Sequence, residues 1–382
     1  MFTSTTTRQP RIAKLAAASA AIALLIAGCG ASNSSSSAST SGVSQPAGTT
    51  VGASGSGTSG ANDQAGGDVT LITHDSFVID DAMLADFEKA SGLTVTVLAQ
   101  GDAGAMVNQL LLTASNPLGD AVFGIDNTFA SKALDAGVLA PYTSPAADSG
   151  SAQYAIGDDR LSAVDYGDVC VNVDHSYFAA KGLPEPVTFE DLAKPEYRDM
   201  LVVESPATSS PGLAFLLGSI AHFGDDGWQA YWTQLKDNGV KVTGGWTDAY
   251  SVDFSGSSGK GARPLVVSYA SSPPSEVPDG ATAAPTGALL DTCFRQVEYA
   301  GVLQGAKNPT GAQQVVDFLL SPEFQASVPD AMYVYPVDTA AALPAAWQSF
   351  APVATDPATL DPAAIAKNRD AWISAWSDLM EG

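Results

Sequence analysis

Basic side chains are scarce in this sequence of 382 residues. Lysine and arginine number 17 against 41 aspartates and glutamates, which gives a formal net charge of −24. A protein that binds DNA or RNA needs clustered Lys and Arg to neutralise phosphates, and the sequence has no such stripe. The composition therefore argues against a nucleic-acid partner. It favours a small cationic ligand, although a high net charge also simply keeps a protein soluble.

Residues with catalytic or metal-binding chemistry are also few. Three cysteines are too few for a disulfide scaffold or a Cys-rich zinc module, and the three histidines have no metal-ligand spacing. The sequence lacks a Gly-x-Ser-x-Gly elbow and a phosphate-binding loop. We therefore predict no catalytic residue, no metal and no cofactor. A binding protein is favoured over an enzyme, which stays open because catalytic residues need not be close in sequence.

The N-terminal residues have the order of a secretory signal peptide. Arg8, Arg11 and Lys14 precede a short apolar run over residues 15–26, which is too short for a permanent membrane anchor. The run ends in Leu25-Ile26-Ala27-Gly28-Cys29, which resembles the lipobox of bacterial lipoproteins. We predict a signal peptide over residues 1–28 and lipidation of Cys29. The alternative is an ordinary signal peptide with a coincidental cysteine.

Residues 30–67 consist mainly of Ser, Gly, Ala and Thr. Such a segment cannot bury enough apolar surface to offset the entropy lost on ordering. We predict that residues 29–67 are a lipidated cysteine followed by a flexible tether.

A series of alternating strands and helices follows. The apolar patterns predict strands at residues 69–73, 93–98 and 121–125, and helices at 81–90 and 105–113. This alternation is typical of an α/β domain with a largely parallel sheet, in which ligands bind at the carboxyl ends of strands. Asp75, Ser76, Asp126 and Asn127 come directly after two of these strands. The alternative role for the two aspartates is to cap turns.

A second α/β series begins near residue 163. It contains extended segments at 163–173, 200–203 and 264–269 and helices starting near 189, 213 and 228, with a further helix ending at Tyr250. The segment from Ser205 to Gly212 carries hydroxyls and a proline just before the helix at 213–223. Such a helix start either binds an anion with its free amides or caps only its own helix.

Eight motifs, taken in order, resemble the periplasmic thiamine-binding proteins, the solute receptors of thiamine ABC transporters. The likeness runs from about Val69 to the end of the chain. The motifs are Thr73-His74-Asp75-Ser76-Phe77, Gly124-Ile125-Asp126-Asn127, Asp165-Tyr166-Gly167, Thr208-Ser209-Ser210-Pro211-Gly212-Leu213, Gly245-Trp246-Thr247-Asp248-Ala249-Tyr250, Ser268-Tyr269-Ala270-Ser271-Ser272-Pro273, Tyr335-Pro336-Val337 and Asp370-Ala371-Trp372-Ile373-Ser374-Ala375-Trp376.

The resemblance implies an α/β, two-lobed periplasmic-binding-protein-like fold (type II) with the ligand cleft between the lobes. Lobe 1 would comprise residues 68–166 and about 291–337, and lobe 2 residues 167–290. Residues 338–382 would form a C-terminal helical segment packed on the lobes. The implied function is an extracytoplasmic lipoprotein, anchored at the cell membrane, that captures thiamine and delivers it to an ABC permease.

The chemistry of thiamine suits residues in these motifs. Its thiazolium carries a fixed positive charge, which requires carboxylates or aromatic faces, and its flat aminopyrimidine favours stacking. The alternative role for each candidate aromatic residue is packing in the core. Tyr333 stands where the family has a tryptophan. The implied ligand-binding residues are Asp75, Ser76, Asp126, Asn127, Ser209, Ser210, Gly212, Trp246, Tyr250, Tyr269 and Tyr333.

The motifs also suit phosphorylated ligands, and the resemblance implies a disulfide. Ser209, Ser210 and Gly212 suit a hydroxyl or a phosphate, so thiamine phosphates are possible second ligands. Cys170 and Cys293 would lie on neighbouring crossover strands and form a disulfide, the alternative being two free thiols. Three other functions stay open: a polyamine receptor, a ferric-ion receptor and a thiamine-cleaving enzyme.

Overall fold

A computed structural model describes residues 66–147, 149–156 and 159–382 of the chain. The predicted signal peptide, the predicted lipidation site Cys29 and the predicted tether as far as residue 65 lie outside the described residues. Residue Gly67, expected at the end of the tether, is instead the first residue of a strand. None of the helices in the described ranges is long and apolar enough to cross a membrane.

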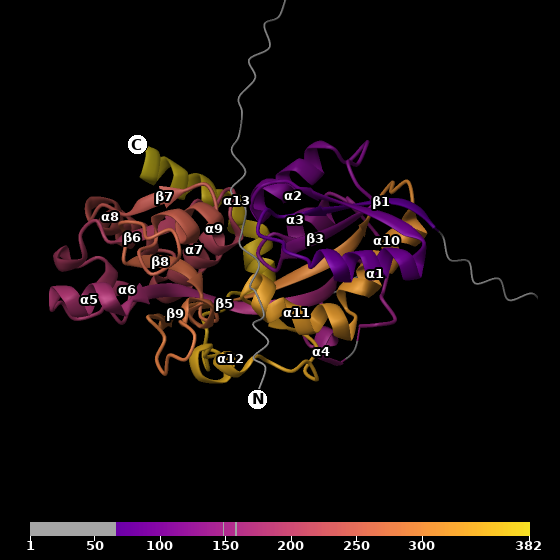
Figure 1. The fold of residues 1–382 in the computed structure, drawn as a ribbon. Coiled ribbons are helices and arrows are strands. Elements are labelled where there is room, and N and C mark those ends of the chain that lie inside the picture. Colours follow the sequence, from indigo (N-terminus) through magenta and orange to yellow (C-terminus); the bar gives the residue numbers. More distant parts are fainter. Residues whose placement is uncertain (1–65, 148, 157–158) are drawn as a thin grey trace, which may run out of the picture. The chain divides into compact units, whose positions relative to one another are not determined.

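One sheet forms the centre of the described body (Figure 1). Its strands follow the order β2-β1-β3-β9-β5-β8-β6-β7, with β4 paired to β9 and β10 paired to β5. The strands are β1 (Gly67–Thr73), β2 (Leu93–Ala99), β3 (Ala121–Asp126), β4 (Leu139–Ala140), β5 (Ser162–Asp174), β6 (Leu201–Glu204), β7 (Lys241–Thr243), β8 (Leu265–Tyr269), β9 (Thr286–Leu303) and β10 (Tyr335–Pro336).

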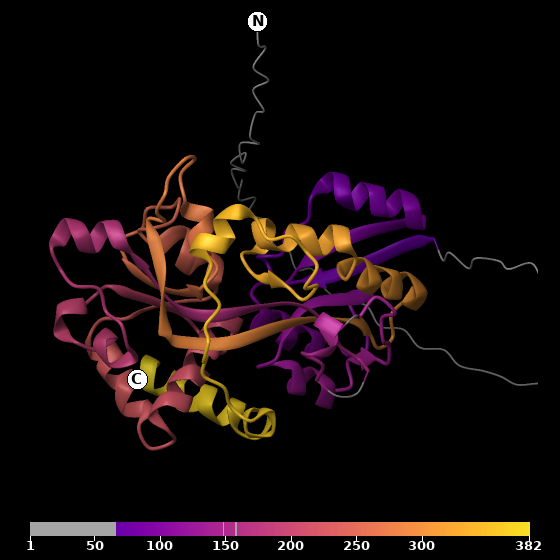
Figure 2. The ribbon, with the colours of Figure 1, turned by 90° about the horizontal axis from the view of Figure 1, so that it is seen from below.

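The expected parallel pairing is confirmed for the strands on which it was based, β1, β2 and β3, whereas the middle of the sheet is antiparallel. Strand β1 pairs in parallel with β2 and β3, and β6 pairs in parallel with β7 and β8. The long strands β5 and β9 pair antiparallel with each other and with β8 and β3. Strand β5 runs from one half of the body to the other and β9 runs back, so they have opposite directions (Figure 2).

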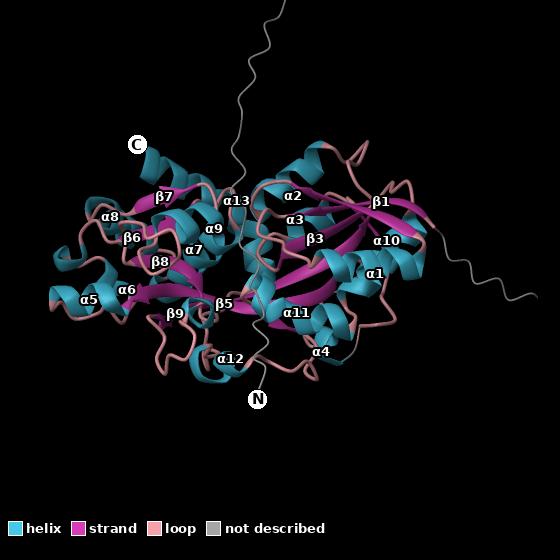
Figure 3. Cartoon of the chain, viewed as in Figure 1, coloured by secondary structure: helices cyan, strands magenta, loops and turns pink. Residues whose placement is uncertain are grey.

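Helices cover both faces of the sheet in each half of the body (Figures 2 and 3). The first half contains β1–β4 with α1 (Asp81–Ser91), α2 (Ala103–Leu112), α3 (Ala130–Asp135), α10 (Pro309–Leu319) and α11 (Pro322–Met332). The second half contains β6–β8 with α5 (His175–Lys181), α6 (Phe189–Leu192), α7 (Ser210–Phe223), α8 (Trp228–Asp237) and α9 (Trp246–Asp248). The other α-helices of the described residues are α4 (Ser149–Ala152), α12 (Ala345–Phe350) and α13 (Pro362–Glu381), and short 3-10 or π helices lie at η1 (Pro195–Tyr197), η2 (Ala249–Asp253) and η3 (Pro273–Glu276).

The start of α7 follows from its sequence. Ser209 is the N-cap residue, and its hydroxyl accepts the backbone N–H of Gly212 at 3.4 Å. Pro211 suits the first turn because its fixed φ is already helical and no N–H is needed there. The helix therefore begins at Ser210, within the hydroxyl-rich segment that we expected to precede it.

The predicted disulfide between Cys170 and Cys293 is confirmed. The two Cα atoms lie 4.2 Å apart on β5 and β9, and both residues are buried. The β5–β9 register shifts beside Cys170, between Val169 and Val171. The bond therefore joins the two strands that connect the halves.

Helix α13 contacts both halves of the body. The guanidinium of Arg369, which is 4% exposed, donates to the carbonyl of Thr128 at 3.3 Å and to the hydroxyl of Ser131 at 2.9 Å. Further along the helix, Trp376 packs edge-on against Trp232 of α8, with ring centroids 5.4 Å apart. The helix thus bridges α3 and α8.

Candidate ligand-binding site

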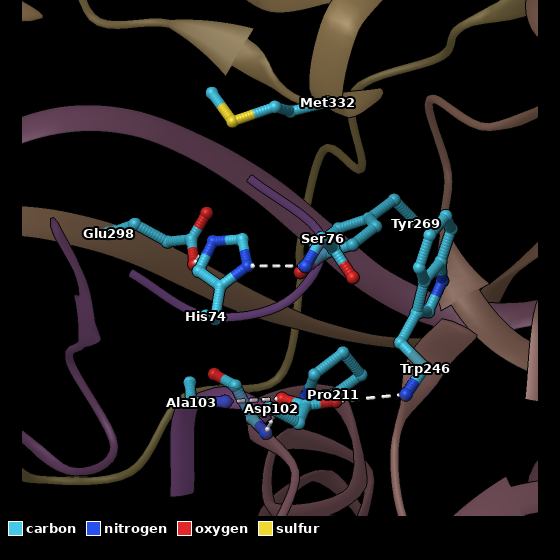
Figure 4. Close-up of a pocket in the computed structure, with 10 residues that line it drawn as sticks. His74, Ser76, Asp102, Ala103, Pro211, Trp246, Tyr269, Glu298 and Met332 are labelled. Carbon is cyan, nitrogen blue, oxygen red and sulfur yellow. Dashed lines mark hydrogen bonds and ion pairs between the residues drawn. The ribbon is translucent and has the colours of Figure 1, made fainter. Parts of the chain in front are cut away.

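Two adjoining cavities lie where the first and second halves of the body meet. The inner cavity, of about 30 Å³, is lined by His74, Ser76, Asp102, Ala103, Ser210, Pro211, Trp246, Tyr269, Glu298 and Met332 (Figure 4). The outer cavity, of about 250 Å³, is lined by Asp75, Ser76, Val78, Trp246, Thr247, Tyr250, Ser251, Ser258, Glu276, Ala331, Met332 and Tyr333. Because Ser76, Trp246 and Met332 line both, we treat the two cavities as one cleft.

The structure brings seven of the predicted ligand-binding residues to this cleft. Ser76 follows β1, Tyr269 ends β8 and Ser210 begins α7, so three separate elements contribute. The seven residues are Asp75, Ser76, Ser210, Trp246, Tyr250, Tyr269 and Tyr333.

The other four predicted residues lie outside both cavities, and their polar groups are used within the protein. Asp126 accepts two backbone N–H groups and the hydroxyl of Thr128, and it also accepts the hydroxyl of Ser210. Asn127 accepts the N–H of Val297 and donates to the carbonyl of Arg295, which braces β3 against β9. Ser209 caps α7, and a Cβ on Gly212 would lie 2.6 Å from the carbonyl oxygen of Glu204.

Three aromatic rings form one wall of the outer cavity. The ring of Trp246 stacks on that of Tyr250, with centroids 4.9 Å apart and an interplanar angle of 14°. The ring of Tyr333 lies 6.0 Å from Trp246 and 6.3 Å from Tyr250. The indole N–H of Trp246 donates to Ser268 at 2.9 Å, and the hydroxyl of Tyr250 donates to Glu276 at 3.1 Å. These bonds fix the rings, and their faces suit a cation or a flat heteroaromatic ring.

Asp102 connects the two halves across the inner cavity. One carboxylate oxygen accepts the backbone N–H of Ala103 at 2.6 Å and that of Ser210 at 3.2 Å, and the other accepts the N–H of Trp246 at 2.9 Å. Burial raises the pKa of Asp102, and these hydrogen bonds oppose that shift. At the start of α7, the backbone N–H of Ser210 is therefore used by a carboxyl group of the protein itself.

Two further contacts close the cleft beside Asp102. The N–H of Ala105 donates to the carbonyl of Thr208 at 3.0 Å, and a Cβ at Gly104 would lie 2.8 Å from the carbonyl carbon of Thr208. The hydroxyls of Ser76 and Thr247 are 3.2 Å apart across the cleft. The halves therefore meet at close range, and a glycine is required at position 104.

The cleft is acidic. Asp75, Asp102, Glu276 and Glu298 line it, and no Lys or Arg is among the residues described as lining either cavity. Burial is the main cause of a raised pKa at Asp75 and at Glu276, and the negative charge of Asp102 adds to the shift at Asp75. The charge of Lys260 lowers the pKa of Glu276, although Lys260 is not a lining residue. The arrangement therefore suits an organic cation.

Sequence reasoning missed His74, Asp102, Glu276, Glu298 and Met332 as lining residues. Asp102 carried a usable signal, because it follows the exit of strand β2 just as Asp75 follows β1. Glu298 carried none, because it lies inside the long strand β9 and no feature of its neighbours marks it.

Comparison with known proteins gives a consistent result. Residues 116–356 match a family model described as bacterial extracellular solute-binding protein. The thiamine-binding periplasmic protein of Escherichia coli (strain K12) is 31% identical over 319 residues, covering 81% of this chain and 92% of that protein.

Solved structures give the same fold. A structure titled periplasmic thiamin binding protein superposes with a TM-score of 0.71 at 27% identity, covering 82% of this chain and 96% of the other. A ferric binding protein from Campylobacter jejuni, at 18% identity and a TM-score of 0.65, covers 81% of this chain and 99% of the other and shares the fold alone.

Proposed function

The chain belongs to the family of bacterial extracellular solute-binding proteins, and we propose that its solute is thiamine, which it captures outside the cytoplasm and delivers to an ABC permease. One observation carries the proposal: the wall formed by Trp246, Tyr250 and Tyr333 faces a cleft lined by carboxyl groups. Thiamine combines a permanent cation with a flat heteroaromatic ring. A cation over such a face gains about 0.5–2 kcal/mol, more when it is desolvated.

The charge of the cleft favours thiamine over its phosphates. A phosphate would bring negative charge beside Asp75 and Glu276, with no lining Lys or Arg in the described residues to balance it. The N–H of Ser210, expected to hold a phosphate, already donates to Asp102. We therefore propose thiamine as the preferred ligand and expect weaker binding of its phosphates.

The alternative functions have less support from the cleft. A ferric-ion receptor would want paired tyrosines with a carboxylate or a histidine. The sequence has no adjacent Tyr-Tyr pair, and the described residues hold no group of three or more His, Cys, Asp or Glu that could bind a metal ion. A thiamine-cleaving enzyme would need a nucleophilic cysteine, but Cys170 and Cys293 are joined in a disulfide. We therefore favour a non-enzymatic receptor. A polyamine has the required charge but lacks a ring to stack on the aromatic wall.

The proposal extends to how the protein is held and how it moves. Lipidation at Cys29 would anchor the mature protein at the extracytoplasmic face of the membrane, and a tether that ends before strand β1 would let the body reach its permease. We place the moving lobes at residues 68–166 with about 291–337, and at 167–290. The two long strands β5 and β9 would then act as the hinge.

Calorimetric titration of the mature protein tests this proposal. The ligands are thiamine, thiamine monophosphate, thiamine diphosphate, spermidine and Fe³⁺, each titrated separately. We expect saturable binding of thiamine with one site per chain and weaker binding of the diphosphate. Saturable binding of spermidine or Fe³⁺ with no heat from thiamine would overturn the proposal.

A further inference from the structure

Three acidic side chains share one rung of the central sheet. Asp126 of β3 pairs with Glu298 of β9, and Glu298 pairs with Asp165 of β5. Residues paired directly across antiparallel strands project from the same face of the sheet. All three are buried, with Asp126 and Asp165 fully enclosed and Glu298 5% exposed at the inner cavity. Burying three carboxylates together is costly unless each is paired or protonated.

Asp126 is satisfied as an anion, whereas Asp165 is not. Asp126 accepts the N–H groups of Thr128 and Phe129 and two hydroxyls, one of them from Ser210. Among the residues that the structure describes, no N–H or hydroxyl donates to either carboxyl oxygen of Asp165. The residue paired with Asp165 across the β5–β9 register is Glu298, so the two buried carboxyl groups project from the same face of the sheet. Two ionised carboxylates side by side in a buried site repel each other, so this pairing favours a proton on one of them.

His74 approaches Glu298 from the exit of β1. The backbone N–H of Ser76 donates to Nδ1 of His74 at 3.2 Å, which assigns the ring proton to Nε2. Nε2 lies 3.4 Å from a carboxyl oxygen of Glu298. The ring rests over β3 at Gly124, which has a φ of +99° and where a Cβ would overlap the ring. Figure 4 shows His74 beside Glu298.

We propose that Glu298 and Asp165 share one proton in the ligand-free protein, that this proton leaves when a cation enters the cleft, and that Glu298 then serves as the counter-ion of the ligand. The inference rests on the proposed function, because it takes the ligand to be a cation such as thiamine. The free pair carries one negative charge. With both groups ionised and one cation bound, the net charge is again one negative, so the buried charge does not change and the proton passes to solvent.

The surroundings of the pair support this exchange. Burial raises the pKa of Asp165 to about 7 and holds that of Glu298 well above its usual range. The other titratable groups that face Glu298 are His74 and Asp126, while Tyr269 and Asp102 lie beyond them across the inner cavity. None of these residues brings the permanent positive charge that would ionise both carboxyls. A bound cation would supply it.

The sign of the pH dependence follows from linkage. A cation lowers the pKa of the pair, so binding releases a proton at pH values between the pKa of the pair in the complex and its pKa in the free protein. Thiamine affinity should therefore rise with pH until the free pair ionises, by up to about tenfold per pH unit for a single proton. Above that pH there is no proton to displace, and the affinity should level off.

The test measures proton release during binding to the whole mature protein. Thiamine is titrated calorimetrically at about pH 6.5, where the free pair should still hold its shared proton. The titration is repeated in two buffers of different ionisation enthalpy, because the difference in heat reports the protons released. We expect release of between about one half and one proton per thiamine bound. Thiamine binding with no proton release and a pH-independent affinity would overturn the inference while leaving the proposed function intact. Absence of thiamine binding would instead overturn the proposed function.

Two variants and a neutral ligand identify the groups. Glu298→Gln keeps the shape of the pair but removes the counter-ion, so thiamine affinity should fall by about tenfold or more. The neutral analogue 3-deazathiamine, in which carbon replaces the charged ring nitrogen, should be unaffected by this change. In Asp165→Asn the amide donates to Glu298 without a titrating proton, so thiamine binding should persist and lose its pH dependence. Equal losses for both ligands in a folded Glu298→Gln protein would contradict the role of Glu298, and an unchanged pH profile in Asp165→Asn would contradict the shared proton.

Discussion

The carboxylate of Asp102 accepts the backbone N–H of Trp246 at 2.9 Å, from a position 144 residues earlier in the chain. Asp102 belongs to the start of α2 in the first half of the body, and Trp246 belongs to the aromatic wall in the second half. One hydrogen bond therefore links closure of the cleft to the position of the ring that we expect to hold the ligand.

Asp102→Asn tests this link. Asparagine is as good an N-cap as aspartate, so α2 should remain intact, but its amide offers a single acceptor oxygen. Losing one hydrogen bond to a charged group should cost about 1.5–3 kcal/mol, or about tenfold or more in thiamine affinity. We expect most of the loss as faster dissociation, measured by stopped-flow tryptophan fluorescence.

Asp80→Asn is the matched control for this variant. Asp80 caps α1 through the N–H groups of Ala82 and Met83 and lines neither cavity. The Asp80→Asn protein should bind thiamine as the wild type does. If Asp102→Asn releases thiamine no faster than Asp80→Asn, Asp102 does not hold the cleft closed.

Trp246→Ala removes the centre of the aromatic wall. Truncating a desolvated aromatic anchor costs about 2 kcal/mol or more, which is about thirtyfold in affinity. Trp246→Phe keeps a ring and should lose less. Trp372→Ala, on α13 away from both cavities, is the control for loss of a tryptophan. Normal thiamine binding by a folded Trp246→Ala protein, measured by calorimetry, would remove this residue from the site.

The site residues that sequence can predict lie at the ends of strands or at the start of a helix. Ser76 and Tyr269 sit at strand exits and Ser210 at a helix start, positions that hydrophobic patterning alone can locate. The Asp165–Glu298 pair could not be found in this way, because it arises from the pairing of β5 with β9 across 133 residues of sequence. The antiparallel middle of the sheet was missed for the same reason, since strand patterns do not record direction.

The start of α7 shows a second limit of prediction from sequence, which concerns the partner of a hydrogen bond. The sequence of residues 205–212 predicts a helix start that either binds an anion with its free amides or caps only its own helix, and in the structure Ser209 caps that helix. It does not indicate which group accepts the backbone N–H of Ser210. Asp102 lies 108 residues earlier, and only the approach of the two halves brings it to Ser210. Local sequence thus identifies the donor group, and tertiary structure decides its partner.

Replacing Cys29 by Ala tests the proposed anchor. In wild-type cells we expect the mature protein in the membrane fraction, starting at a lipidated Cys29 and lacking residues 1–28. The variant cannot receive lipid on sulfur, so it should remain unprocessed or appear in the soluble fraction, as read by fractionation and intact mass. A wild-type protein that is cleaved elsewhere and carries no lipid would show that the signal peptide is an ordinary one.

Loss of the Cys170–Cys293 bond should lower stability far more than affinity. The bond closes a loop of 123 residue steps between β5 and β9, for which the chain-entropy model gives about 4–5 kcal/mol as an upper value. Both cysteines are buried and neither lines the cleft. The Cys170→Ser, Cys293→Ser double variant should therefore unfold at lower denaturant concentration yet bind thiamine within about twofold of wild type, because its aromatic wall and carboxyls are unchanged. A thiol count in the wild-type protein tests whether the bond forms. The denatured, unreduced protein is alkylated and its mass is measured, and Cys170 and Cys293 should remain unmodified. Alkylation of both cysteines in freshly exported protein would show that the bond does not form in the cell.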